Sequence, residues 1–188
     1  MLFLSTKLYN VPLFSIRSGG RIGTVIEPII NPHNLHIDGF YCEAVNSQNA
    51  QILLDINVRD ISTRGIIIDD HADLSTPDEL VRLQPVIDLN FSLVEKSALV
   101  NKKKIGKITH FAIDTDSLFI QKFYVQPRGW QSLKTDSLTF DRLSVVEVTD
   151  KAVSFKGPEV KDSQALRLPA QPQKLETDYS ASASTISE

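Results

Sequence analysis

Three histidines lie near carboxylates or near each other, and these residue types could bind a metal. His33 and His36 are three positions apart in the stretch NPHNLH, and His71 lies in the stretch DDHAD. Imidazole nitrogens and carboxylate oxygens are common ligands of zinc and related metals. However, Asn and Pro around His33 predict a turn, where a spacing of three does not aim two side chains at one point as it does on a helix. We therefore expect no metal site, and we interpret DDHAD as a solvated hairpin turn.

Two aspartates and one cysteine offer other chemistry. Asp114 and Asp116, in the stretch DTDS, resemble the opening of a calcium-binding loop, but the rest of that loop is missing. Aspartates in such a stretch accept backbone hydrogen bonds within a turn. Cys42 lies in a strand-like segment, where a buried apolar side chain is favoured over a nucleophile. No nucleophile elbow, phosphate loop or dinucleotide motif occurs, so we expect no catalytic residues, no cofactor and no enzyme.

Consecutive lysines form the one strongly basic cluster of the chain. Lys102, Lys103 and Lys104 lie near Lys96 and Lys107. Such a cluster can contact RNA or an acidic protein. No aromatic residue lies between the lysines, so stacking on nucleic-acid bases is not indicated. The alternative is a solvated hairpin tip, whose charges keep the sheet edge from pairing with other chains.

The stretch PRGWQSL supplies the remaining candidates for a binding surface. Arg128 and Trp130, the only Trp, are residue types that often anchor protein interfaces. Trp130 could equally cover one end of the second repeat described below. Arg128, Trp130 and the three consecutive lysines are the candidate partner-binding residues.

Bulk composition narrows the class of protein. The 188 residues are 41% hydrophobic, which is enough for one domain or two small ones. The net charge of -3 gives no electrostatic reason for strong nucleic-acid binding. A single cysteine excludes an intrachain disulfide and fits a reducing compartment. No apolar run of about 18 residues occurs, so we expect no membrane span and a cytoplasmic protein.

Part of the chain is duplicated. Residues 20–41 match residues 103–124 at a constant offset, which is 106 minus 23, or 83, for Gly106 and Gly23. A second alignment matches residues 66–74 to 146–154 at an offset of 80, which predicts three extra loop residues in the first copy. The repeat is too long for a solenoid unit. We therefore expect two copies of a small domain, at residues 4–74 and 90–156.

The pattern inside each copy is that of β-strands. Turn formers at 31–34 and 114–117 separate runs in which apolar and polar residues are interspersed, which predicts two β-hairpins. Gly23 and Gly106 follow an isoleucine at the start of a strand, where glycine indicates a bulge or a close backbone approach. The residues expected in the core are Ile22, Ile37, Tyr41, Ile105, Leu118, Ile120, Phe123 and Val146.

Two segments lie outside the copies. Residues 75–89 predict a linker with a short helix, because Ser75 or Thr76 can cap it, Pro77 suits its first turn and Pro85 ends it. Residues 157–188 contain several serines and prolines and no Phe or Trp. This composition predicts a disordered C-terminal tail.

The stretches KKKIGKITHFAIDTDSLFIQKFYV and LTFDRLSVVEVTDKAVSFK resemble the PRC-barrel family. The resemblance covers about residues 92–156, and it is weaker in the first copy, where Pro28 and Pro32 fall inside the hairpin. A tandem of two such barrels is also similar to a group of uncharacterised bacterial proteins. The family implies small, strongly bent β-barrels in adaptor roles, as in a reaction-centre subunit and a ribosome-maturation factor. It supplies no catalytic residues to carry over.

Taken together, these features predict an all-β protein of two tandem PRC-like barrels joined by a short helix, with a disordered C-terminal tail. The expected function is a non-catalytic adaptor or scaffold that binds another protein. One alternative is an RNA-processing or ribosome-associated factor, favoured if the lysines are exposed and binding weakens steeply with salt. The other is an enzyme or small-ligand binder, favoured by a deep pocket with converging polar side chains.

Overall fold

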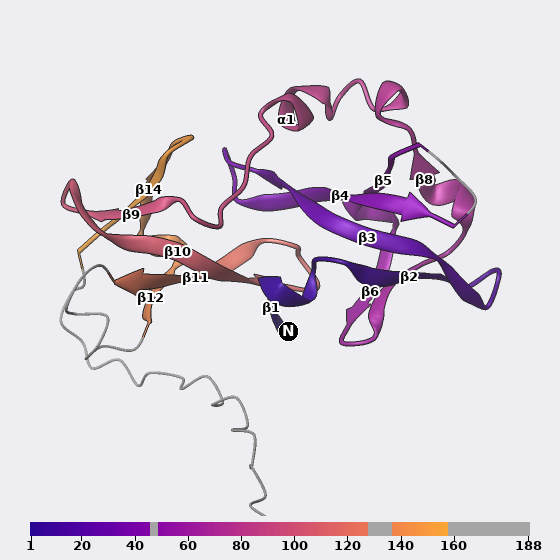
Figure 1. Ribbon diagram of the computed structural model, residues 1–188, viewed down its shortest axis with the longest axis horizontal. Coiled ribbons are helices and arrows are strands. Elements are labelled where there is room, and N and C mark those ends of the chain that lie inside the picture. The colour runs from indigo at the N-terminus through magenta and orange to yellow at the C-terminus, as the bar shows by residue number, and fades with distance from the viewer. Residues whose placement is uncertain (46–48, 128–136, 158–188) are drawn as a thin grey trace, which may run out of the picture.

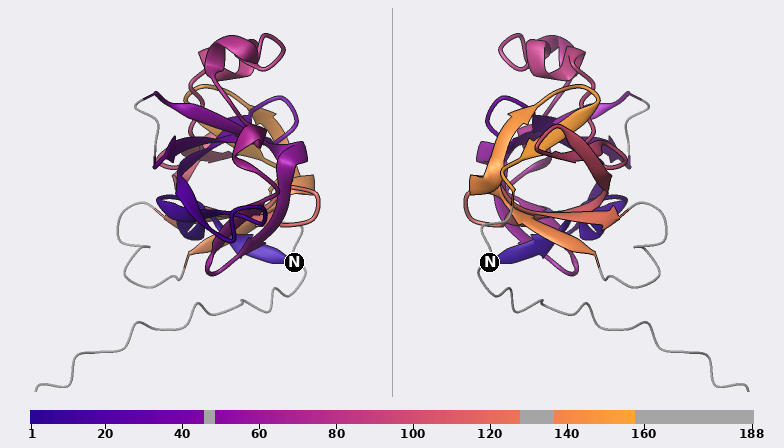
Figure 2. Two further views of the ribbon diagram at one scale, coloured as in Figure 1. Left: turned by 90° about the vertical axis from the view of Figure 1, so that its right-hand side faces the viewer. Right: turned by 90° about the vertical axis from the view of Figure 1, so that its left-hand side faces the viewer.

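The computed structural model describes residues 1–45, 49–127 and 137–157. Apart from Gly157, the predicted tail at 157–188 lies outside the described residues. The described chain forms two curled, seven-stranded sheets that lie end to end (Figure 1). In end-on views, the strands of both sheets wrap around one common axis (Figure 2). The expected mostly-β fold with two curled sheets is confirmed.

The first sheet holds the strands of the first copy, in the order β6-β7-β2-β3-β4-β5-β8. Its centre is the long hairpin of β3 and β4, and β7 pairs in parallel with β2 to complete the curl. Its strands are β2 (Val11–Ser15), β3 (Gly20–Asn31), β4 (His36–Ala44), β5 (Gln51–Leu54), β6 (Val58–Ser62), β7 (Gly65–Ile68) and β8 (Leu74–Ser75).

The second sheet repeats this plan, in the order β12-β11-β10-β9-β14-β13, with one addition. Its long hairpin is formed by β10 and β11, and β14 pairs in parallel with β9. The addition is β1 from the start of the chain, which pairs with the end of β10. Its strands are β1 (Leu2–Leu4), β9 (Ser97–Val100), β10 (Lys103–Asp114), β11 (Ile120–Pro127), β12 (Leu138–Asp141), β13 (Val145–Val148) and β14 (Ala152–Phe155).

Gly23 and Gly106 lie at the same place in the two hairpins, as expected. A Cβ atom on Gly23 would lie 2.4 Å from the carbonyl oxygen of Glu43, and one on Gly106 would lie 2.1 Å from that of Gln126. Glu43 and Gln126 are themselves related by the offset of 83. Each glycine therefore permits a close approach of two backbones that no other residue would allow.

The tips of the two long hairpins meet and bond to each other. The N–H of Ile37 donates to the carbonyl of Leu118 at 3.0 Å, and the N–H of Ile120 donates to that of Leu35 at 2.9 Å. Leu35 corresponds to Leu118 and Ile37 to Ile120. Each of the two hydrogen bonds is therefore the equivalent of the other, with the roles of the two copies reversed. The contact is thus isologous, as in a two-fold symmetric dimer, although both halves belong to one chain.

The N-terminal segment also crosses between the copies. Besides the pairing of β1 with β10, the Oγ of Ser5 accepts a 3.1 Å hydrogen bond from the N–H of Phe111. Side chains of both copies form one continuous buried cluster, which includes Leu13 and Phe40 of the first and Phe111 of the second. The two sheets are therefore built around a shared core.

The linker between the copies differs in detail from the predicted helix. A 3-10 helix spans Pro77–Glu79 and is capped by Thr76, and α1 (Gln84–Asp88) follows it. Pro85 was expected to end a helix, but it lies in the first turn of α1, where its missing N–H costs nothing. Leu83 packs on Ile29 and Ile52, so the linker covers the outer face of the first sheet.

The second alignment of the copies, at an offset of 80, is wrong. The strands β5, β6 and β7 correspond in order and pairing to β12, β13 and β14, and their first residues differ by 138 minus 51, 145 minus 58 and 152 minus 65. Each difference is 87. The extra residues belong to the second copy, between β11 and β12, rather than to the first.

The hairpin interpretation of DDHAD is wrong for the same reason. The hairpin turn of the first copy lies between β6 and β7, and DDHAD follows β7. There, His71–Asp73 form a 3-10 helix with a capping box, in which the side chains of Asp70 and Asp73 each accept a backbone N–H of the other. This helix directs the chain to β8, along the edge of β5.

Four of the eight residues expected in the core are buried, three are half-buried, and Val146 is exposed. Ile37, Leu118, Ile120 and Phe123 are buried, whereas Ile22, Tyr41 and Ile105 are half-buried. Val146 is 63% exposed. The pairing of β13 with β14 shifts register between Val145 and Glu147, so a bulge turns the Val146 side chain away from the core.

Candidate functional site

All three consecutive lysines are exposed: Lys102 lies in the β9–β10 turn, and Lys103 and Lys104 begin β10. Asn101 and Lys102 have φ angles of 50° and 64°, as a tight hairpin turn requires. The neighbouring lysines are engaged elsewhere. Lys107 pairs with Glu95 at 2.6 Å, and Lys96 lies 4.4 Å from the ring centroid of Phe91. The basic surface therefore narrows to Lys102, Lys103 and Lys104. Arg128 and Trp130 lie outside the described residues.

The histidines do not converge on a metal site. His36 Nδ1 lies 2.7 Å from Asp38, and its Nε2 lies 3.9 Å from Asp55. His33 lies in the turn before β4, and His71 begins the 3-10 helix that follows β7. Within residues 1–45, 49–127 and 137–157, no group of three or more His, Cys, Asp or Glu side chains could hold an ion.

Asp114 forms the turn that its sequence predicts. Its Oδ1 accepts hydrogen bonds from the N–H groups of Asp116 and Ser117, at 2.9 and 3.1 Å. These two bonds hold the pKa of the Asp114 carboxyl below its ordinary value. In the first copy, Asn31 Oδ1 accepts the N–H of His33 at 3.0 Å, so both hairpin tips use the same side-chain support.

Cys42 is buried, as expected, and its chemistry follows from that. The side chain is 1% exposed, and burial raises the pKa of its thiol to about 12. A thiol of this kind forms almost no thiolate near neutral pH. Cys42 is therefore a core residue rather than a nucleophile.

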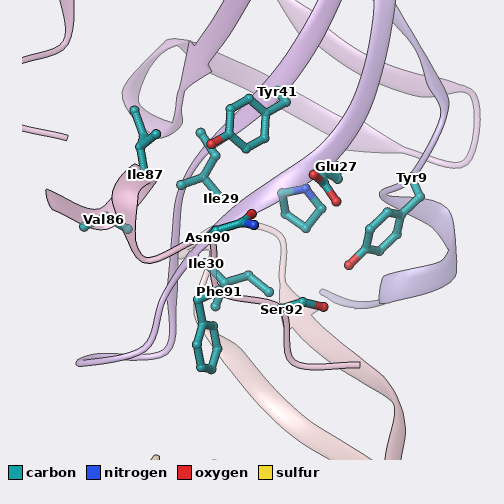
Figure 3. A pocket seen from close by; sticks show the side chains of 11 residues that line it. Tyr9, Glu27, Ile29, Ile30, Tyr41, Val86, Ile87, Asn90, Phe91 and Ser92 are labelled. Atoms are coloured by element: carbon teal, nitrogen blue, oxygen red, sulfur yellow. The ribbon is translucent and has the colours of Figure 1, made fainter. Parts of the chain in front are cut away.

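A small pocket lies where the linker passes over β3 (Figure 3). Its apolar lining includes Ile29 and Ile30, while Tyr9, Glu27 and Asn90 supply polar groups. Burial, together with the nearby Glu27 carboxylate, raises the pKa of Tyr9 to about 12. The cavity volume is about 40 Å³, whereas pockets for small ligands span roughly 300 to 1,000 Å³. This pocket has room for ordered water but not for a substrate.

A larger, open groove lies beside β12 in the second sheet, and we call it the β12 groove. It measures about 910 Å³, and its walls come from β1, the end of β10, β11, β12, the 3-10 helix Arg142–Ser144 and the two residues that follow β14. The residues important below are Lys122, Phe140, Arg142, Leu143, Lys156 and Gly157. Sequence reasoning missed this groove, because the offset of 80 hid which residues of the first copy correspond to its walls.

Polar and aromatic contacts fix the walls of the β12 groove. Phe140 stacks on Phe155 with ring centroids 4.5 Å apart. The Arg142 guanidinium lies 4.1 Å from the ring centroid of Phe119 and donates to the carbonyl of Asn34 at 3.0 Å. Arg142 thus joins the groove to the hairpin tip of the first copy. Leu143 is 90% exposed at the rim.

Comparisons with known proteins add no assignment. No protein-family model matches the chain, and no curated protein matches it. Among the described residues, no helix is long and apolar enough to cross a membrane.

Proposed function

We propose that this chain is a non-catalytic adaptor of the PRC-barrel kind, which binds another protein through the β12 groove. The observation that carries the proposal is the open edge of β12. In the first sheet the corresponding edge, that of β5, is covered by β8, whereas among described residues β12 ends its sheet. Uncovered strand edges are common attachment points for other chains.

The composition of the groove supports a protein partner rather than a substrate. Exposed Leu143 and half-buried Phe140 provide apolar surface, and Arg142 lies between them in the sequence. Aromatic and arginine side chains are enriched in protein interfaces. The pocket beside β3, at about 40 Å³, is too small for a substrate.

A matched pair of variants tests this function. Leu143 and Ile56 correspond at the offset of 87, and they are 90% and 76% exposed, so either can become Asp without disturbing the core. Proteins from the source cells are captured on the wild type, Leu143→Asp and Ile56→Asp. We expect a partner that the wild type and Ile56→Asp retain and that Leu143→Asp loses. Equal retention by all three would exclude the groove as the binding surface.

A second candidate function is binding of RNA or of the ribosome. It is favoured by the exposure of Lys102, Lys103 and Lys104 at one tight turn. Changing all three to Glu should then abolish RNA binding, and wild-type affinity should fall steeply between 50 and 200 mM salt, by about tenfold or more for a few phosphate contacts. RNA binding that is unaffected by the three lysine changes would refute this alternative.

A further inference from the structure

The first copy supplies a template for what covers the edge of this sheet. Strand β8 runs antiparallel to β5, with Leu74 opposite Leu53 and Ser75 opposite Ile52. Leu74 is only 8% exposed and belongs to the shared core. The edge of β5 is thus covered by a short extended segment that buries one leucine between polar residues.

The β12 groove occupies the corresponding place in the second copy. At the offset of 87, Leu53 corresponds to Phe140 and Ile52 to Thr139. Leu53 and Ile52 are fully buried, whereas Phe140 is half-buried and Thr139 is exposed. The groove is lined by both Thr139 and Phe140. Part of the groove therefore runs along the residues of β12 that correspond to the pairing partners of β8.

The chain after β14 does not repeat the sequence that makes β8. The capping-box residues Asp70 and Asp73 correspond to Gly157 and Val160, and the buried Leu74 corresponds to Lys161. The second copy thus lacks both carboxylates of the box and the apolar side chain that β8 buries. The sequence gives no reason for the chain to cover this edge itself.

Charges around the groove indicate the chemistry of the missing strand. At the offset of 87, Arg142 corresponds to Asp55 and Lys156 to Asp69. Two positions that are acidic in the first copy are therefore basic in the second. Lys122 is paired with Asp141 at 3.4 Å, and Asp114 is engaged in its own turn. Arg142 contacts Phe119 and the carbonyl of Asn34, neither of which is charged, so it keeps its positive charge and can attract negative charge together with Lys156.

We propose that an extended, acidic segment of another protein adds to β12 as an antiparallel strand, with one apolar side chain opposite Phe140. This inference rests on the proposed function and names its partner class. Backbone hydrogen bonds along β12 supply the attachment, and the pocket beside Phe140 together with Arg142 and Lys156 selects the sequence. The partner segment resembles residues 69–76 of this chain, DDHADLST, in which three aspartates precede one leucine.

A labelled peptide of sequence DDHADLST is the probe for this binding mode. Its binding to the full-length protein is followed by fluorescence anisotropy and by amide hydrogen exchange. We expect saturable binding, with slower exchange in β12 and no change in β5, whose edge is already covered. A peptide carrying Leu74→Asp should bind at least about tenfold more weakly, because it forfeits the burial of one leucine.

Two variants of the protein separate a specific site from general attraction. Lys156→Glu should weaken peptide binding about three- to tenfold, because it reverses a charge beside the groove. Lys151→Glu, which changes an exposed lysine in the β13–β14 turn, should leave the affinity unchanged. Equal effects of the two variants would contradict binding in the groove.

Three results would overturn strand addition by a partner. Slow exchange in β12 of the free, monomeric protein would mean that the chain covers its own edge. Dimerisation that Lys156→Glu abolishes would make a second copy the occupant. Absence of peptide binding at millimolar concentration, while Leu143→Asp still loses a captured protein, would refute the strand mode but leave the adaptor function standing.

Discussion

The N–H of Ile37 donates a 3.0 Å hydrogen bond to the carbonyl of Leu118, and the N–H of Ile120 donates the equivalent bond to the carbonyl of Leu35. All four residues lie at hairpin tips, and Leu35 and Leu118 have φ angles of 58° and 54°. Leucine rarely adopts this conformation, so each tip is held in place by its surroundings. The duplicated chain therefore behaves like a two-fold dimer joined through one linker.

The two close-approach glycines predict a pair of destabilised variants. Gly23→Ala and Gly106→Ala should each lower the free energy of unfolding by about 1–3 kcal/mol or more, because the new Cβ would overlap a carbonyl oxygen. Gly20→Ala is the control, since nothing lies within 4 Å of a Cβ there, and it should change stability by less than about 0.5 kcal/mol. Urea denaturation measures all three, and equal effects would contradict the described backbone approach.

The strand register predicts stability losses of different size for substitutions in β11 and β13. Ile120→Ala should cost about 2–5 kcal/mol of unfolding free energy, because Ile120 is fully buried and its loss leaves a cavity. Val146→Ala should cost less than about 0.5 kcal/mol, because the bulge exposes Val146. A large loss of unfolding free energy for Val146→Ala would mean that Val146 is buried, as the sequence pattern predicts, and would contradict the bulge.

How far the sequence predicted this structure depends on the kind of signal. The sequence predicted the hairpins at two pairs of positions where backbone geometry dictates the residue type. These pairs are Gly23 with Gly106 and Asn31 with Asp114. The bulge at Val146 could not be predicted from the sequence. The strand is only four residues long, and so short an apolar pattern does not show which residue is the extra one. The β12 groove was missed because it depends on what one copy lacks relative to the other, and this needs the correct alignment of β5 with β12.

The carboxyl of Asp114 predicts a pH effect with a definite sign. Its pKa is lowered in the folded state, so its contribution to stability is present above the ordinary value of 3.8 and is lost as the pH falls through the lower folded value. Asp114→Asn keeps the acceptor oxygen, as Asn31 does in the first copy, but cannot titrate. Between pH 6 and pH 3, wild-type stability should therefore fall more than that of Asp114→Asn, as urea midpoints would show.

Ser5 predicts how strongly the N-terminal segment ties the copies together. Its Oγ accepts the buried N–H of Phe111 at 3.1 Å, and the side chain is 1% exposed. Ser5→Ala removes this acceptor and leaves the N–H in β10 without its partner, which costs about 1–3 kcal/mol. Ser117→Ala, at an exposed position in the hairpin tip, should cost less than about 0.5 kcal/mol.

Hydrogen exchange gives a sharper measurement of the same contact. Exchange at Phe111 should accelerate in Ser5→Ala by more than global destabilisation explains, because the edge of β10 opens locally where β1 covers it. If protection is lost equally along β3 and β10, the N-terminal segment unfolds with the whole molecule and is an inseparable part of the shared core.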